Sequence, residues 1–162
     1  MKKNDIKKTN AARILDREKV PYELVAYEVD PDNLAADHVA ESLGEPIEQV
    51  YKTLVLRSEK NEVFVCVIAG NHEIDLKKAA KAAGHKKVEM LPLKELLPTT
   101  GYIRGGCTSI GMKKDYPVFV SEEMLQFPFI YVSAGQRGLQ LKLSPQDLIK
   151  VAKATPAELI KS

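Results

Sequence analysis

Segments rich in β-branched and aromatic residues fill the middle of the chain, and segments with helical end signals lie towards both ends. Helices are predicted at residues 10–19, 33–43, 76–83, 92–97, from 144 onward and, as a final short helix, from 155 onward. Strands are predicted at residues 22–29, 50–56, 62–68, 87–91, 118–120, 129–133 and 139–143. Because strand and helix do not alternate regularly, this order favours a mixed α+β domain with a curved central sheet over a doubly wound parallel sheet.

Several helix ends are predicted by capping residues, which satisfy the unpaired backbone N–H and C=O groups there. Thr9 or Asn10 can cap the first helix, Asp75 can cap the helix at 76–83, and Gly84 can end it. No repeat, low-complexity stretch or linker interrupts the series. We therefore expect a single domain over residues 1–162.

The composition is that of an ordinary globular protein, with 44% apolar and 28% charged residues. The net charge of +2 neither requires nor excludes a nucleic-acid partner, because a local basic face matters more than the total. The lysine-rich first eight residues could be a solvated tail or a weak phosphate contact. No apolar run suits a signal peptide or a membrane span, and two cysteines are too few for a disulfide framework. We expect a soluble cytoplasmic protein with no membrane partner.

Lys52 lies in a predicted strand among apolar residues. Alternate residues of a strand share a face, so Lys52 shares its face with Val50, Leu54 and Leu56. A buried ammonium group is costly without a partner. Lys52 is therefore either an edge residue that reaches water along its stem or a cation at the floor of a pocket.

A glycine-rich loop is predicted over residues 99–114. Four glycines between Gly101 and Gly111 would let backbone N–H groups approach a ligand, although a purely structural loop with tight turns is the alternative. The spacing fits neither a Walker loop nor a dinucleotide fingerprint. Cys107 could be a nucleophile, but no histidine is committed to it.

A third polar segment, residues 133–140, connects two predicted strands. It could be a simple hairpin connection or the polar rim of a pocket with Ser133 at a strand end. Serine-hydrolase elbows, zinc-protease motifs and CxxC pairs are absent from the sequence, and the three histidines lack metal-ligand spacing. Any hydrolytic chemistry therefore lacks an obvious triad or metal.

Four motifs occur in a fixed order along the chain. They are Val-Tyr-Lys-Thr-Leu at 50–54, the glycine loop ending in Gly-Met-Lys-Lys at 111–114, Tyr-Val-Ser-Ala-Gly at 131–135 followed by Arg-Gly-Leu at 137–139, and Leu-Ser-Pro-Gln-Asp-Leu at 143–148. Taken together, they resemble the YbaK family, which is similar to the editing insertion of bacterial prolyl-tRNA synthetases. The likeness runs over residues 11–151.

The resemblance implies a mixed, barrel-like sheet surrounded by helices, and a trans-editing deacylase that removes cysteine from mischarged Cys-tRNA(Pro). It implies no metal and no organic cofactor, and it implies tRNA and prolyl-tRNA synthetase as partners. By position, Lys52 corresponds to the family's central lysine and Thr53 follows it. The other pocket positions that the resemblance implies are Tyr27, Tyr102, Gly105, Ser133 and Gln140.

The chemistry that the resemblance implies needs no enzyme nucleophile. The thiol of the misattached cysteine attacks its own ester carbonyl and leaves as a cyclic thiolactone, a step that gains from being held in geometry. Backbone N–H groups around Gly105 and Gly106 would stabilise the oxyanion, and Lys52 would bind the terminal ribose or phosphate.

Other functions remain open at the sequence level. The chain carries Leu34-Ala35-Ala36 where some relatives have an aromatic residue, so the substrate could instead be Ala-tRNA(Pro) or another small aminoacyl-tRNA. A non-catalytic regulatory or binding module is the alternative from another class. A basic face could dock the acceptor stem or simply be solvated; its lysines are Lys77, Lys78, Lys81, Lys86 and Lys87.

Overall fold

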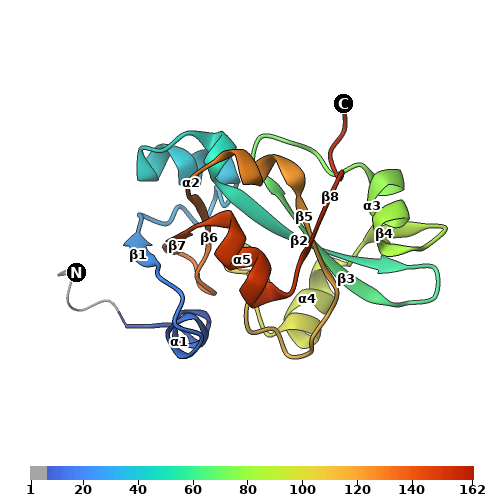
Figure 1. Ribbon diagram of the computed structural model, residues 1–162, viewed down its shortest axis with the longest axis horizontal. Helices are drawn as coiled ribbons and strands as arrows, with labels where there is room; N and C mark the ends of the chain where they lie inside the picture. The colour runs from blue at the N-terminus through green and yellow to red at the C-terminus, as the bar shows by residue number, and fades with distance from the viewer. Residues whose placement is uncertain (1–6) are drawn as a thin grey trace.

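The computed structural model describes residues 7–162, so most of the lysine-rich start of the chain lies outside the described residues. Its elements follow one another as Figure 1 shows. The helices are α1 (Asn10–Arg17), α2 (Ala36–Leu43), α3 (Leu76–Ala83), α4 (Leu93–Thr100) and α5 (Pro145–Ala152), with the short 3-10 helices η2 (Ile47–Gln49) and η3 (Glu122–Gln126). The strands are β1 (Glu23–Ala26), β2 (Tyr51–Ser58), β3 (Val63–Ala69), β4 (Val88–Met90), β5 (Val118–Ser121), β6 (Ile130–Ser133), β7 (Leu139–Leu143) and β8 (Thr155–Ala157).

The larger sheet has five strands in the order β4-β2-β3-β5-β8. β2 and β3 form the predicted hairpin, with Tyr51 opposite Ala69 and Arg57 opposite Val63. β4 pairs antiparallel with β2, whereas β5 and β8 are added in parallel on the other side. β3 is therefore an interior strand, which explains why its sequence is a continuous apolar run.

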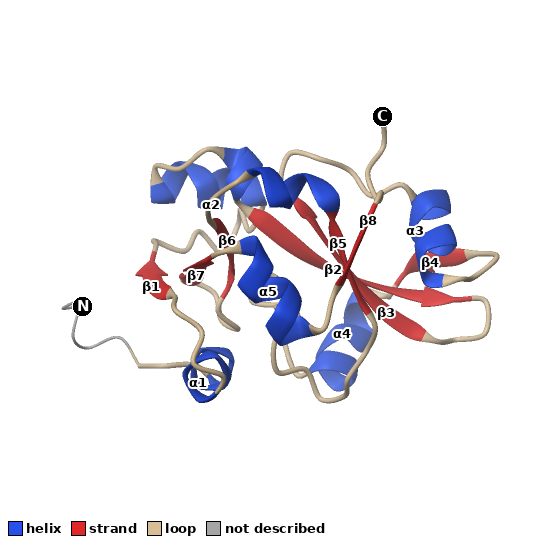
Figure 2. Ribbon diagram, viewed as in Figure 1, coloured by secondary structure: helices blue, strands red, loops and turns tan. Residues whose placement is uncertain are grey.

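The smaller sheet has three antiparallel strands in the order β1-β7-β6. Within the described residues it meets the larger sheet through one isolated parallel bridge, between Val50 and Tyr131. The mixed α+β class is confirmed, but the expected barrel-like sheet is not. The β6–β7 hairpin pairs with β1 instead of continuing the larger sheet, so the strands form two open sheets, with the helices lying around them (Figure 2).

The apolar core lies on both faces of β3. Val65 and Val67 pack in one cluster with α1 and the smaller sheet, whereas Phe64, Cys66 and Ile68 pack in another beneath α3. This alternation follows from the two-residue repeat of a strand. The two clusters fix β2, the neighbour of β3, between them.

Most predicted elements are present, but the last one is wrong. Thr155 and Pro156, which predicted a helix start, lie in β8 and pair in parallel with β5. Proline is tolerated there because β8 is the edge strand of its sheet. The strand predicted at 22–29 is shorter, and η3 was not predicted. Among the described residues, no helix has both the length and the apolar character needed to cross a bilayer.

Candidate functional site

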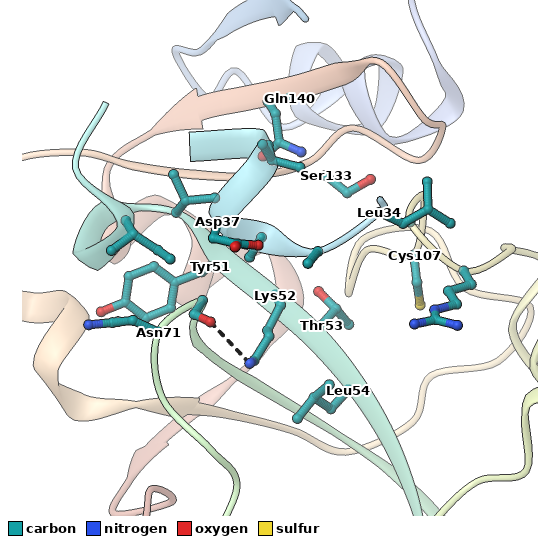
Figure 3. Close-up of a pocket in the computed structure, with 18 residues that line it drawn as sticks. Leu34, Asp37, Tyr51, Lys52, Thr53, Leu54, Asn71, Cys107, Ser133 and Gln140 are labelled. Atoms are coloured by element: carbon teal, nitrogen blue, oxygen red, sulfur yellow. Dashed lines mark hydrogen bonds between the residues drawn. The ribbon is translucent and has the colours of Figure 1, made fainter. Parts of the chain in front are cut away.

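A cavity of about 580 Å³ opens beside the N-terminal half of β2. Its wall combines the start of α2, the turn after β3, the glycine loop and the ends of β6 and β7 (Figure 3). Of the residues predicted from the sequence, the structure brings five to this wall: Lys52, Thr53, Gly105, Ser133 and Gln140. Segments far apart in the sequence thus converge where the two sheets meet.

Lys52 points its ammonium group at the turn after β3. Its Nζ donates a hydrogen bond of 3.2 Å to the carbonyl oxygen of Gly70. Burial lowers the pKa of Lys52 from its ordinary value of 10.5, and the nearby Glu73 carboxylate opposes that shift. Lys52 thus lies on the cavity wall, which agrees with the second of the two alternatives, a cation in a pocket.

Residue 70 has to be a glycine because α2 and the backbone of Val50 lie too close to it for a side chain. A Cβ added there would be 2.4 Å from Ala36 Cβ and 3.2 Å from the Val50 carbonyl oxygen. Contacts this short force neighbouring atoms to move. The absence of a side chain at residue 70 therefore lets α2 close against the turn and leaves the Gly70 carbonyl free to meet Lys52.

Ser133 and Gln140 are direct partners in the β6–β7 register. The Ser133 hydroxyl accepts a hydrogen bond of 3.1 Å from the N–H of Gly135. Gln140 is only 4% exposed, and its Oε1 has no hydrogen-bond partner among residues 7–162. A buried carbonyl oxygen without a donor is costly, so the Gln140 amide is an unusual polar group in this part of the cavity wall.

The glycine loop is anchored on the β6–β7 hairpin. A Cβ at Gly106 would lie 3.0 Å from Gln136 Cα, and Arg137 Nε donates a hydrogen bond of 2.8 Å to the Arg104 carbonyl oxygen. The Gly106 N–H donates to Ile103 at 3.0 Å. Gly106 is buried and serves close packing in this structure, whereas Gly105 lines the cavity.

Tyr27 and Tyr102, two predicted pocket residues, are not among the residues that line the cavity. The Tyr102 hydroxyl donates to the Ile110 carbonyl oxygen at 2.5 Å, and its ring lies 3.2 Å from where a Gly135 Cβ would be. Burial raises the pKa of Tyr102 to about 12. The backbone N–H of Tyr27 bonds to Gly138. Both tyrosines support the loops that shape the cavity.

Cys107 lines the cavity, but its thiol is not activated. Burial raises its pKa to about 12, and the smaller effect of a hydrogen bond with Thr100 is in the opposite direction. A thiol is nucleophilic as the thiolate, so a raised pKa keeps Cys107 inert at neutral pH.

Sequence reasoning missed three polar residues of the cavity wall, namely Asp37, Asn71 and Arg104. Asp37 lies in the first turn of α2, and Figure 3 shows its carboxylate and the Lys52 side chain on the same cavity. No sequence signal links these residues to Lys52, because each is an ordinary surface type in its own segment. Together with Lys52 they give the wall two cations and one carboxylate, which suits a ligand with both anionic and cationic groups.

Comparisons with known proteins point to one kind of activity. The model of a family described as aminoacyl-tRNA editing domain matches residues 30–151, a span that includes Lys52, the glycine loop and Gln140. The chain is 49% identical over 158 residues to EbsC of Enterococcus faecalis, provisionally named a Cys-tRNA(Pro)/Cys-tRNA(Cys) deacylase. That alignment covers 98% of this chain and 96% of EbsC.

More distant matches agree with this. A proline–tRNA ligase of Cupriavidus necator is 27% identical over 130 residues, which are 78% of this chain and 23% of the ligase. A crystal structure described as a proposed trans-editing enzyme for prolyl tRNA synthetase shares the fold. It has a TM-score of 0.80 and 22% identity over 96% of this chain and 100% of that one.

Proposed function

Because the chain belongs to the aminoacyl-tRNA editing domain family, we propose that it is a deacylase that releases cysteine from mischarged Cys-tRNA(Pro). The observation that carries the proposal is the cavity, whose wall brings together Lys52, Asp37 and Gln140, the last with an amide oxygen that has no partner within residues 7–162. An aminoacyl ester of tRNA brings an ammonium group, a carbonyl that gains negative charge, and a phosphate backbone. Each finds a complementary group there.

The bond-breaking step is supplied by the substrate. The cysteine thiol attacks the ester carbonyl carbon, a tetrahedral oxyanion forms, and the bond to the ribose oxygen breaks. The thiol proton passes to that ribose oxygen, so the products are a thiolactone and uncharged tRNA. Holding thiol and carbonyl in place is the main contribution required of the protein, and the inert Cys107 is consistent with this.

Individual residues take complementary roles in this proposal. The Gly105 N–H, for which no hydrogen-bond partner is found within residues 7–162, stabilises the oxyanion. Gly106 would have to give up its bond to Ile103 to do the same, so we assign it to packing. Gln140 Oε1 accepts from the α-ammonium group, and Lys52 binds the terminal ribose or phosphate.

Thr53 and Ser133 are the remaining polar side chains that we assign to the aminoacyl group, since both line the cavity. Tyr27 and Tyr102 take part indirectly, through the loops that they support. The similarity to proline–tRNA ligases supports prolyl-tRNA synthetase as a partner that hands over the mischarged tRNA.

The decisive experiment is the release of labelled cysteine from Cys-tRNA(Pro), with and without prolyl-tRNA synthetase. We expect rapid release by the unaltered protein and by Lys60→Ala, a control in the exposed β2–β3 turn. Lys52→Ala should lose most of the activity. No release by the unaltered protein under either condition would refute the proposal.

The same assay with other aminoacyl groups tests the mechanism and the breadth of substrates. Seryl-tRNA(Pro) lacks the thiol and should be cleaved far more slowly. Equal rates for cysteine and serine would show that water, not the thiol, is the nucleophile. Alanyl-tRNA(Pro) belongs in the panel because Leu34, Ala35 and Ala36 leave this part of the cavity wall without an aromatic ring.

A further inference from the structure

A second recess, of about 310 Å³, adjoins the cavity on the side of α4. The two share five lining residues, which are Thr53, Leu54, Arg104, Gly105 and Cys107. Beyond these, the recess is lined by apolar side chains from β2, the end of β4 and α4, namely Val55, Met90, Leu91, Leu93 and Leu96. Leu93 is 60% exposed, so this apolar wall is open to solvent at its mouth.

The recess also contains an open strand edge. β4 pairs with β2 only from Leu56 to Ser58, and beyond it the Leu91 N–H bonds to the Val55 carbonyl oxygen at 2.9 Å. In an antiparallel ladder, residues two apart direct their backbone groups to the same side. The N–H and C=O of Thr53 therefore point away from β3, towards the recess. Among residues 7–162 no strand pairs with Thr53 on that side.

An apolar wall beside a free donor and acceptor is an environment that suits a nucleobase. Bases are held in proteins by stacking on apolar or cationic planes and by hydrogen bonds at their edges. Adenine offers, side by side along one edge, an exocyclic N–H donor and a ring-nitrogen acceptor that are both bonded to the same ring carbon. That edge is complementary to the C=O and N–H of a strand, and the Arg104 guanidinium lies in the same wall.

The position of the recess fits the substrate. The amino acid of an aminoacyl-tRNA is esterified to the ribose of the terminal adenosine, so the adenine lies one sugar away from the scissile ester. We propose that this recess is the subsite for the terminal adenine, with Leu93 and Met90 flanking the base and Thr53 reading its edge. The inference rests on the proposed function, because it places the amino acid in the adjoining cavity.

A third recess beside Lys52 suits another part of the substrate. Its wall carries three lysines, Lys52, Lys77 and Lys161, beside Glu73, Asp75 and four apolar residues, and Lys161 is paired with Glu73 at 3.2 Å. Lys52 and Lys77, which form no ion pair within the described residues, favour the sugar-phosphate chain here, since phosphate contacts come largely from lysine and arginine. The ester then lies over β2, with the base on one side and the preceding phosphate on the other.

The test compares two leucines of the same helix. Leu93 lines the recess and Leu97, one turn later and 52% exposed, does not. Both are largely exposed, so Leu93→Glu and Leu97→Glu should fold alike. In an isotope-labelled protein titrated with adenosine 5′-monophosphate, we expect shifts of the amide signals of Thr53, Val55 and Leu91. Leu93→Glu should weaken this binding at least tenfold and Leu97→Glu should leave it unchanged.

Catalysis provides a second readout. Leu93→Glu should raise KM for Cys-tRNA(Pro) with little change in the rate for a simple cysteine ester that lacks a base. Shifts confined to other parts of the molecule, or equal binding of the nucleotide by both variants, would overturn the subsite while the deacylase proposal stands. Conversely, the expected shifts in a protein that cleaves no aminoacyl-tRNA would support a nucleobase site and refute the proposed function.

Discussion

Lys52 combines its proposed role in substrate binding with a cost to the fold. Burial lowers its pKa below 10.5, so the folded chain holds this proton less firmly than the unfolded chain does. Between the lowered pKa and 10.5 the unfolded state binds more protons, so stability rises with pH across that window. At neutral pH, which lies below this window, the charged Lys52 therefore lowers the stability of the folded state.

Replacing Lys52 by methionine should separate these two effects. We expect kcat/KM for Cys-tRNA(Pro) to fall roughly 10- to 100-fold. This corresponds to the loss of one hydrogen bond to a charged group, which contributes about 1.5–3 kcal/mol. The melting temperature should not fall, because the burial cost is removed as the Gly70 hydrogen bond is lost. Deacylation rates and thermal unfolding at neutral pH measure both; a large drop in melting temperature would mean that Lys52 is mainly structural.

Cys107→Ala should leave the enzyme active within about threefold. Burial raises the pKa of this thiol to about 12, so it is protonated at neutral pH and is a poor nucleophile. Steady-state deacylation is the measurement, with circular dichroism as the check on folding. A folded but inactive Cys107→Ala protein would require a covalent enzyme intermediate instead of the substrate thiol.

At the scale of elements, capping residues predicted helix ends correctly where the ends depend on local contacts alone. Asp75 accepts hydrogen bonds from the N–H groups of Lys77 and Lys78, and Gly84 adopts the left-handed conformation with a φ of 77°, so α3 begins and ends as predicted. β8 was missed because Thr155-Pro156 fits a helix start equally well. Only its pairing with β5, a contact that no local pattern contains, selects the strand.

The packing of α2 against the turn after β3 can be tested by a double-mutant cycle. Gly70→Ala should destabilise the protein by about 1–3 kcal/mol and lower deacylation, because its Cβ would collide with Ala36 Cβ. Adding Ala36→Gly should restore part of that loss, since it removes the opposing atom. Chemical denaturation of the unaltered protein, the two single variants and the double variant gives the coupling free energy between residues 36 and 70. Strictly additive changes in the free energy of unfolding would contradict the contact.

At the scale of the whole molecule, the site is formed by segments that are distant in the sequence, and no sequence pattern predicts that they are close in space. The motifs identified Lys52, Ser133 and Gln140, and these do line one cavity. Asp37 and Arg104 carry no such signal, since their place depends on how α2 and the glycine loop fold over β2. The net charge of +2 was uninformative for the same reason. What matters is the local gathering of cations near Lys52.

Of the five lysines considered for docking, Lys77 lines the recess beside Lys52, whereas Lys78 is paired with Glu158 at 3.0 Å. We expect Lys77→Ala to reduce the salt dependence of kcat/KM by about 0.7 in logarithmic slope, the value for one phosphate of a single strand. Lys81→Ala, on the same helix and outside that recess, should leave the slope unchanged. Deacylation rates over a salt series provide the measurement, and equal slopes for all three proteins would place the phosphate elsewhere.

The open edge of β2 has a consequence beyond substrate binding. Unpaired strand edges are templates on which a second chain can add a strand, and proteins commonly guard them with lysine. Lys52 lies next to the unpaired backbone groups of Thr53, so the residue that we assign to the substrate also places a charge beside this short unpaired part of β2. We therefore expect Lys52→Met to aggregate more readily than the unaltered protein although its melting temperature does not fall, and a bound ligand that covers Thr53 to slow that aggregation.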